Sequence, residues 1–137
     1  MKLKKKIPLI DQHDKFGFWG GKFGGSFIPE TLKKPVEDLT KEFQKLRKDK
    51  KFLEKRDFYF KNYVGSPTSF IKLERLTDHL NGAQIWAKVV SEANGGAHKI
   101  YNATVHALIC KSMGKKYIAG DTGAGYAGKM LSMAAKK

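Results

Sequence analysis

The sequence has a single cysteine, Cys110, among its 137 residues. One thiol excludes an intramolecular disulfide and indicates a reducing compartment. Because Cys110 lies in a helical pattern beside Ala107, we expect a buried structural thiol. Long hydrophobic runs are also absent: residues 7–10 are too short for a signal peptide, and no run approaches the roughly 20 residues that span a membrane. We therefore expect a cytoplasmic protein without a membrane segment.

Acidic residues are scarce: 13 Asp and Glu stand against 27 Lys and Arg, which gives a formal net charge of +14. Such a charge occurs in proteins that bind nucleic acids. Here, however, the cations are spread over the N-terminal tail, residues 41–56 and the C-terminus, without an arginine-rich or aromatic-interleaved cluster. We interpret them as solvated faces, and a basic nucleic-acid-binding protein remains an alternative that we do not favour. The four histidines lack metal-ligand spacing, so no metal site is expected.

The N-terminal half of the chain predicts an arm followed by helices. Residues 1–28 are rich in glycine and aromatic residues and have no periodicity, which predicts an irregular arm. Residues 29–46 place Leu32, Val36, Leu39, Phe43 and Leu46 on one helical face. Further helices are expected at residues 52–63 and 73–80, the latter closed by Asn81-Gly82.

The C-terminal half predicts an α/β arrangement. Residues 84–90 and 117–119 have the composition of strands, and residues 99–113 have that of a helix. A final helix follows the glycine loop at residues 121–125. The order strand, helix, strand, helix predicts a βαβα unit with a parallel pair of strands. The expected organisation is an arm over residues 1–28 and one body over residues 29–137.

Two glycine loops carry the candidate chemistry. Gly95-Gly96-Ala97-His98-Lys99 opens a predicted helix, either as a reactive lysine that forms a Schiff base or as an ordinary capped loop with an exposed lysine. Residues 123–128 match G-x-G-x-x-G, and with Lys129 they match a P-loop pattern. Both matches are partial, because the acid of a dinucleotide site would lie beyond residue 137 and Met130 stands where a P-loop needs Ser or Thr. A tight turn alone also explains these glycines.

In a parallel sheet both loops would lie at the same edge, where ligands bind. This topology predicts that Lys99 and Asp121 share a pocket.

Four motifs in order resemble the tryptophan synthase β chains, which are pyridoxal-phosphate enzymes of fold type II. They are Phe23–Leu32 (an FGG…PE signature), Asn62–Thr68 (a YxGRPT segment with Ser66 in place of arginine), Gly95–Lys99 (the cofactor-lysine motif) and Met113–Lys116 followed by Thr122–Gly125. The resemblance covers residues from about 16 to 137 and corresponds to about the first third of the family's length.

The resemblance implies a role for each site residue. Lys99 would bind pyridoxal phosphate covalently and move protons, and His98 would lie near the cofactor phosphate. Thr122, Gly123, Ala124 and Gly125 would hold the substrate carboxylate through backbone N–H groups. Asp121 occupies the position of the family's catalytic glutamate. The implied reaction is the lyase-class β-replacement that joins L-serine and indole into L-tryptophan, in amino-acid biosynthesis.

Several departures from the family lead us to expect weak or no activity from this chain alone. Lys88-Val89-Val90-Ser91 replaces Lys-Arg-Glu-Asp, Tyr126-Ala127 replaces Gln-His, and Asp121 is one methylene shorter than glutamate. The family's phosphate-binding loop comes from later residues, so we expect a truncated copy. Implied partners are a tryptophan synthase α chain and further β chains. The alternative is a non-catalytic module that binds an α-chain-like partner.

Overall fold

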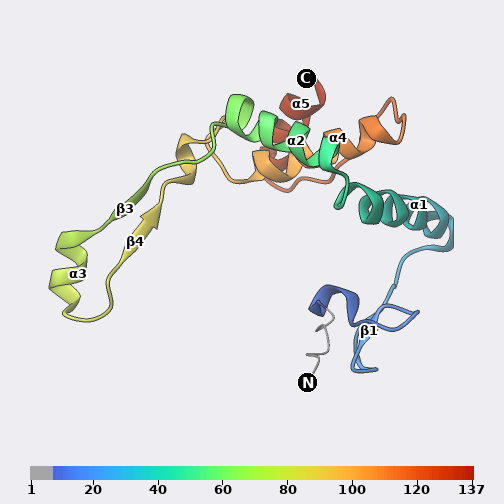
Figure 1. Cartoon of the computed structure of the whole chain (residues 1–137), viewed down its shortest axis with the longest axis horizontal. Coiled ribbons are helices and arrows are strands. Elements are labelled where there is room, and N and C mark those ends of the chain that lie inside the picture. The colour runs from blue at the N-terminus through green and yellow to red at the C-terminus, as the bar shows by residue number, and fades with distance from the viewer. Residues whose placement is uncertain (1–7) are drawn as a thin grey trace. The chain divides into compact units, whose positions relative to one another are not determined.

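The computed structural model of the chain describes residues 8–137 (Figure 1). The chain divides into two units, Met1–Leu39 and Thr40–Lys137. The predicted arm over residues 1–28 begins in residues 1–7, which lie outside the described part, and its boundary at residue 28 stays a prediction.

The first unit has little regular structure before its helix. A 3-10 helix, η1 (Leu9–Asp11), precedes the two-residue strands β1 (Phe18–Trp19) and β2 (Phe23–Gly24), which pair antiparallel. The Asp14 carboxylate accepts hydrogen bonds from the backbone N–H groups of Phe16 and Phe18 and so shapes the turn. Apart from η1 and this short pair, residues 8–28 have no regular secondary structure.

Helix α1 (Glu30–Leu46) forms as predicted, but its apolar face is largely uncovered. Leu46 is 5% exposed, whereas the other four members of the stripe are 40–48% exposed: Leu32, Val36, Leu39 and Phe43. Apolar residues at helical spacing therefore predict the helix correctly, but they do not predict that these side chains are buried within the chain.

The second unit is built on three helical segments. Helix α2 (Lys50–Tyr59) begins at Asp49, whose carboxylate accepts a hydrogen bond from the Phe52 backbone N–H at 2.8 Å. It continues as a π-helix, η2 (Phe60–Val64), which ends at Gly65 in the left-handed region. Helices α4 (Lys99–Ser112) and α5 (Tyr126–Ala135) pack against each other, and all three segments match the sequence prediction closely.

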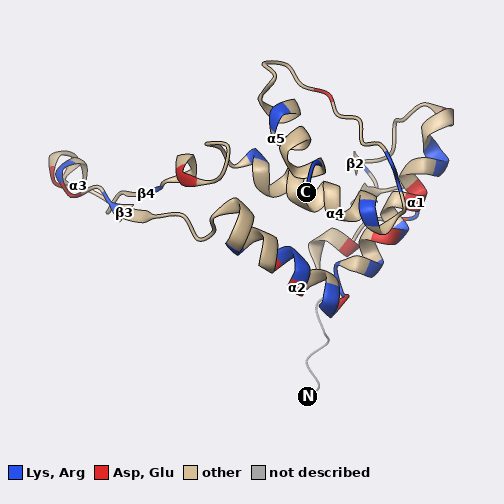
Figure 2. Cartoon of the chain, turned by 90° about the horizontal axis from the view of Figure 1, so that it is seen from above, with Lys and Arg blue, Asp and Glu red and all other residues tan. Residues whose placement is uncertain are grey.

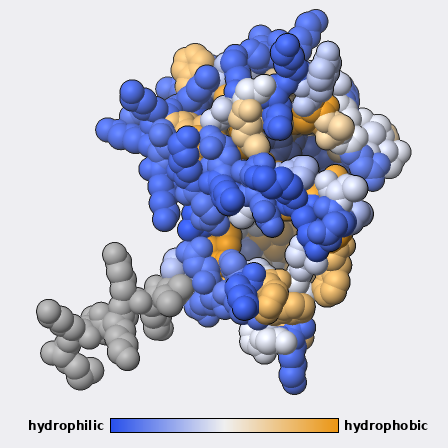
Figure 3. All heavy atoms as spheres, turned by 90° about the vertical axis from the view of Figure 1, so that its right-hand side faces the viewer, coloured by the Kyte–Doolittle hydropathy of each residue, from blue (hydrophilic) through white to orange (hydrophobic). Residues whose placement is uncertain are grey.

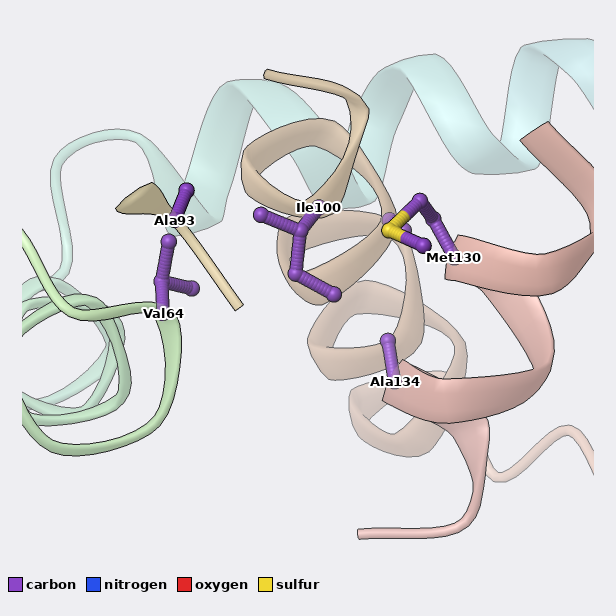
Figure 4. Packing of buried hydrophobic residues seen from close by; sticks show 6 residues of the cluster. Val64, Ala93, Ile100, Met130 and Ala134 are labelled. Carbon is purple, nitrogen blue, oxygen red and sulfur yellow. The ribbon is translucent and has the colours of Figure 1, made fainter. Parts of the chain in front are cut away.

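The core lies where α4 and α5 meet the end of η2. Side chains from η2, the loop after residue 92, α4 and α5 converge there, as Figure 4 shows. Ile100, Met130 and Val64 are fully buried, and Ala93, Ala103 and Ala134 complete the cluster. Small alanines beside large Ile and Met side chains allow the helices to approach closely.

A hairpin completes the unit. Strand β3 (Phe70–Lys72) pairs antiparallel with β4 (Trp86–Lys88), with Ile71 opposite Ala87. Helix α3 (Glu74–Leu80) lies between the strands and ends at Asn81, which takes the left-handed conformation expected of a helix cap.

The predicted βαβα unit is wrong in its topology, although the fold mixes helices and sheet. In residues 8–137 both sheets are two-stranded and antiparallel. The predicted strand at residues 117–119 is absent, and Tyr117 is 91% exposed. The segment 84–90 contributes β4, but its partner is β3, which precedes it in the chain. Strand composition in 117–119 was insufficient because a strand also needs a neighbour to pair with.

Every lysine in residues 8–137 is exposed, which confirms the interpretation of the positive charge as solvated faces. Figure 2 shows Lys and Arg distributed over several helices, and Figure 3 shows apolar side chains between hydrophilic ones on one face. Cys110 is partly exposed, so the prediction of a buried thiol is wrong. None of the helices in residues 8–137 has the length and apolar character needed to cross a membrane.

A carboxylate connects the hairpin to the loop that follows it. The Glu92 side chain, at the end of the 3-10 helix η3 (Val90–Glu92), accepts a hydrogen bond from the Ser69 backbone N–H at 2.6 Å. The Val89 N–H donates to the Ser69 carbonyl at 2.9 Å. The hydrogen bonds from Ser69, with a smaller contribution from the Lys88 ammonium, hold the pKa of Glu92 below its ordinary value.

Ile100→Ala is expected to lower the free energy of unfolding by about 2–5 kcal/mol, because it removes a fully buried side chain and leaves a cavity. Ile71→Ala is the matched control, since Ile71 is 47% exposed, and its effect should stay below about 1 kcal/mol. Urea denaturation followed by circular dichroism measures both. Equal losses would show that the α4–α5 contact is not the core.

Glu92→Gln is expected to destabilise the protein at neutral pH and to have no effect in acid. A carboxyl whose folded pKa is lowered stabilises the fold above its unfolded pKa, and this contribution is lost as the pH falls from the ordinary pKa of a glutamate through the lowered folded pKa. Denaturation midpoints at a series of pH values measure the difference. Glu54→Gln, on the exposed surface of α2, should give a nearly constant small difference. A Glu92→Gln effect that persisted at low pH would contradict the assignment.

Candidate functional site

The glycine turn before α4 is held to the core by backbone hydrogen bonds. Asn94 N–H donates to the Val64 carbonyl at 2.9 Å, and Gly96 N–H donates to the Ala93 carbonyl at 2.7 Å. Gly95 and Gly96 have φ of 85° and 80°, in the left-handed region that favours glycine. The sequence therefore needs glycine at both positions to form this turn.

The same turn packs against the beginning of α5. A Cβ added at Gly95 would lie 2.5 Å from Cε and 2.6 Å from Sδ of Met130. The Tyr126 hydroxyl donates a hydrogen bond to the Gly95 carbonyl. The loop before α4 and the loop before α5 are thus neighbours, and the contact that joins them is helical packing rather than a parallel sheet.

Lys99 is the first residue of α4, and its side chain is exposed. The next residue, Ile100, is fully buried, so the helix turns Lys99 away from the core. His98 is the residue before the helix; it is exposed, and its side chain makes no capping hydrogen bond. Both predicted cofactor-contacting residues are therefore accessible to a ligand from solvent.

The loop before α5 is open to solvent along its whole length. Asp121, Thr122, Gly123, Ala124 and Gly125 are all exposed. A Cβ added at Gly123 or Gly125 would meet no atom within 4 Å. Helix α5 begins at Tyr126 without a side-chain cap, so its first N–H groups have no protein side chain as acceptor. This arrangement suits an anion such as a carboxylate.

The turn before α4 packs against the beginning of α5, but among the described residues no interaction links the predicted site residues of the two loops. Within residues 8–137, no hydrogen bond or ion pair links Lys99 with Asp121 or with the Thr122–Gly125 loop. The parallel-strand argument for a shared pocket fails with the parallel sheet itself. The assignment of these residues as a site stays a prediction that depends on the resemblance.

The residues present fit part of what pyridoxal phosphate requires. Lys99 offers an accessible amine for its aldehyde, and two adjoining helix starts offer N–H groups to anions. Neither loop lines the cavity of about 410 Å³ found elsewhere in this unit. Attachment and anion binding are therefore possible, whereas enclosure of the cofactor requires more than these residues.

Two features of the unit were missed by sequence reasoning. Thr68 is 5% exposed, and its hydroxyl has no hydrogen-bond partner among the described residues. The cavity beside α4 is lined by residues from five segments, including Tyr59, Thr104 and Lys111. Neither feature has a sequence signal, because both depend on how separate segments pack.

No protein-family model matches the chain. Two curated relatives, each named "Tryptophan synthase beta chain", come from Leptospira biflexa serovar Patoc, strains Patoc 1 / Ames and Patoc 1 / ATCC 23582 / Paris. Each is 49% identical to this chain over 108 residues, which cover 79% of this chain and 27% of the relative. The chain thus matches about a quarter of the length of these relatives. Over the matched residues, the chain is similar to the tryptophan synthase beta chains, which confirms the resemblance that its motifs predict.

Proposed function

We propose that this chain carries the cofactor-lysine region of a tryptophan synthase β-type protein, with Lys99 as the residue that binds pyridoxal phosphate. The observation that carries the proposal is the contact of the Gly95–Gly96 turn with Tyr126 and Met130. It holds the lysine motif beside the loop that resembles the family's substrate-carboxylate loop. Lysine suits the role because its neutral amine attacks aldehydes.

The two loops would have different roles in the reaction. Bound pyridoxal phosphate supplies an electron sink that withdraws charge from the α-carbon of a substrate. The Lys99 amine moves a proton at that carbon, and His98 contributes an N–H near the cofactor phosphate. The N–H groups of Thr122–Gly125 bind and orient the substrate carboxylate at the start of α5. The Asp121 carboxyl group would donate a proton to the departing hydroxyl, which leaves as water, and the resulting carboxylate would accept the proton that indole loses.

The family membership supports a β-replacement as the reaction class: L-serine and indole combine to L-tryptophan with loss of water. An α chain and further β chains are the partners that the relatives' name implies. The fold type II arrangement is part of this proposal, since the small antiparallel sheets of residues 8–137 do not by themselves display it.

The chain alone should have weak activity, because its site residues are exposed. Lys99, His98, Asp121 and the Thr122–Gly125 loop all face water. Efficient chemistry of this kind needs a site that excludes water and holds reacting groups within a fraction of an ångström. Cofactor attachment is therefore a more direct test of the proposal than turnover.

Incubation with pyridoxal phosphate followed by borohydride reduction should label Lys99 ahead of the other lysines. The chain is treated with substoichiometric pyridoxal phosphate, and the labelled peptides are quantified by mass spectrometry. Lys99→Arg keeps the charge and should remove the main labelled peptide together with the visible absorbance band. Lys111→Arg, on the same helix, is the matched control and should leave both intact. Labelling spread evenly over the lysines would refute the proposal.

Asp121→Glu should raise tryptophan formation from serine and indole by about tenfold or more, because it moves the carboxylate outward by roughly an ångström. A coupled assay of L-tryptophan at saturating cofactor measures the change. Asp121→Asn should reduce the same activity, since an amide does not carry the proton. Equal activities for all three proteins would remove Asp121 from the catalytic role.

A further inference from the structure

We propose that the cavity between α2, α4 and the end of α5 binds a small aromatic carboxylate, at a site separate from Lys99. The cavity has a volume of about 410 Å³, within the range of small-molecule sites. Its lining comes from α2, η2, α4, α5 and the segment after α4, so residues distant in sequence build it together. Neither Lys99 nor Asp121 contributes to it.

The walls of the cavity are apolar and aromatic. Leu108 and Ala134 are buried, and Ala107 and Ile118 are partly buried beside them. Tyr59 and Tyr63 add two aromatic rings. Rings and aliphatic side chains of this kind bind a flat apolar body through the hydrophobic effect and ring stacking.

The orientation of one ring is fixed by the protein itself. The Tyr63 hydroxyl donates to the Met133 carbonyl at 2.8 Å, which ties η2 to α5. Thr104 is also buried at the cavity, and its hydroxyl donates to the Ile100 carbonyl at 2.8 Å. Because the Thr104 hydroxyl already donates within α4, it requires no hydrogen-bond acceptor from a ligand. We therefore expect the part of the ligand that faces Thr104 to be apolar.

The charged groups around the cavity are all cationic. Four exposed lysine side chains line it and no Asp or Glu side chain of residues 8–137 does: Lys111, Lys115, Lys116 and Lys137. None of the four forms an ion pair in residues 8–137, whereas Lys33, Lys34 and Lys45 do. Lys137 Nζ lies 5.3 Å from the centre of the Tyr63 ring. Unpaired ammonium groups around apolar walls favour a ligand with an apolar body and one negative charge.

The probe is 2-naphthoate, with 2-naphthamide as its uncharged counterpart of the same shape. Isothermal titration should show naphthoate binding at least about fivefold more tightly than naphthamide, the upper range for exposed charge pairs. The difference should shrink in high salt, because salt screens exposed charges. Equal affinities would refute the proposed charge selection.

Cys110 reports the location of binding, because it lines the same cavity and is partly exposed. Saturating naphthoate should slow alkylation of the Cys110 thiol by several-fold, followed by mass spectrometry. Unchanged alkylation under saturation would place the ligand elsewhere and overturn the proposal. The readout does not involve pyridoxal phosphate, so it is independent of the Lys99 assignment.

Two kinds of variant complete the test. Lys111→Gln with Lys115→Gln should weaken naphthoate binding several-fold and leave naphthamide unchanged. Lys51→Gln with Lys55→Gln removes the same charge from exposed positions outside the cavity and should leave both affinities unchanged. If both pairs of substitutions weakened naphthoate binding equally, the affinity would depend only on the net charge of the chain, and the proposal would be refuted.

Ala107→Phe should abolish binding of both probes by filling the cavity, with circular dichroism confirming that the variant folds.

Discussion

The contact between Met130 and the Gly95 turn is the constraint on which the second unit depends. Met130 is fully buried, and its side chain occupies the space where any residue other than glycine would place a Cβ at position 95. The contact therefore fixes two things at once: the close approach of α5 to α4 and the left-handed turn that begins α4. The backbone hydrogen bonds of Asn94 and Gly96 and the Tyr126 hydroxyl hold the same turn, so the Met130 contact acts together with them. The core and the candidate site are held by the same atoms.

Much of the remaining apolar surface is not used by the fold. The stripe on α1 stays 40–48% exposed at four positions, and Phe70 and Trp86 stack on the hairpin while remaining 62% and 46% exposed. Exposed apolar surface on this scale marks surfaces that associate with other protein surfaces. The stability of residues 8–137 accordingly comes from the few side chains between α4, α5 and η2 rather than from the amphipathic helix with the clearest sequence pattern.

The sequence predicted local structure better than arrangement. Helical spacing located α1, α2, α4 and α5, and Asn81 was correctly identified as the end of α3, because these features depend on neighbouring residues. The parallel pair was wrong because pairing depends on which strands are available: β4 pairs with β3, and residues 117–119 pair with nothing described. Burial was similarly misjudged for Cys110, whose helical neighbours are apolar but which faces the cavity. The family motifs predict Lys99 and the Thr122–Gly125 loop as site residues, yet no pattern in the sequence indicates that Tyr126 and Met130 contact the turn before Lys99.

Helix α4 shows how one element can serve two surfaces. Its first residue, Lys99, faces solvent, and Ile100 and Ala103 face α5. Thr104, Ala107 and Leu108 face the cavity, one to two turns further along. The proposed carboxylate site and the predicted cofactor lysine therefore lie at separate positions along the same helix.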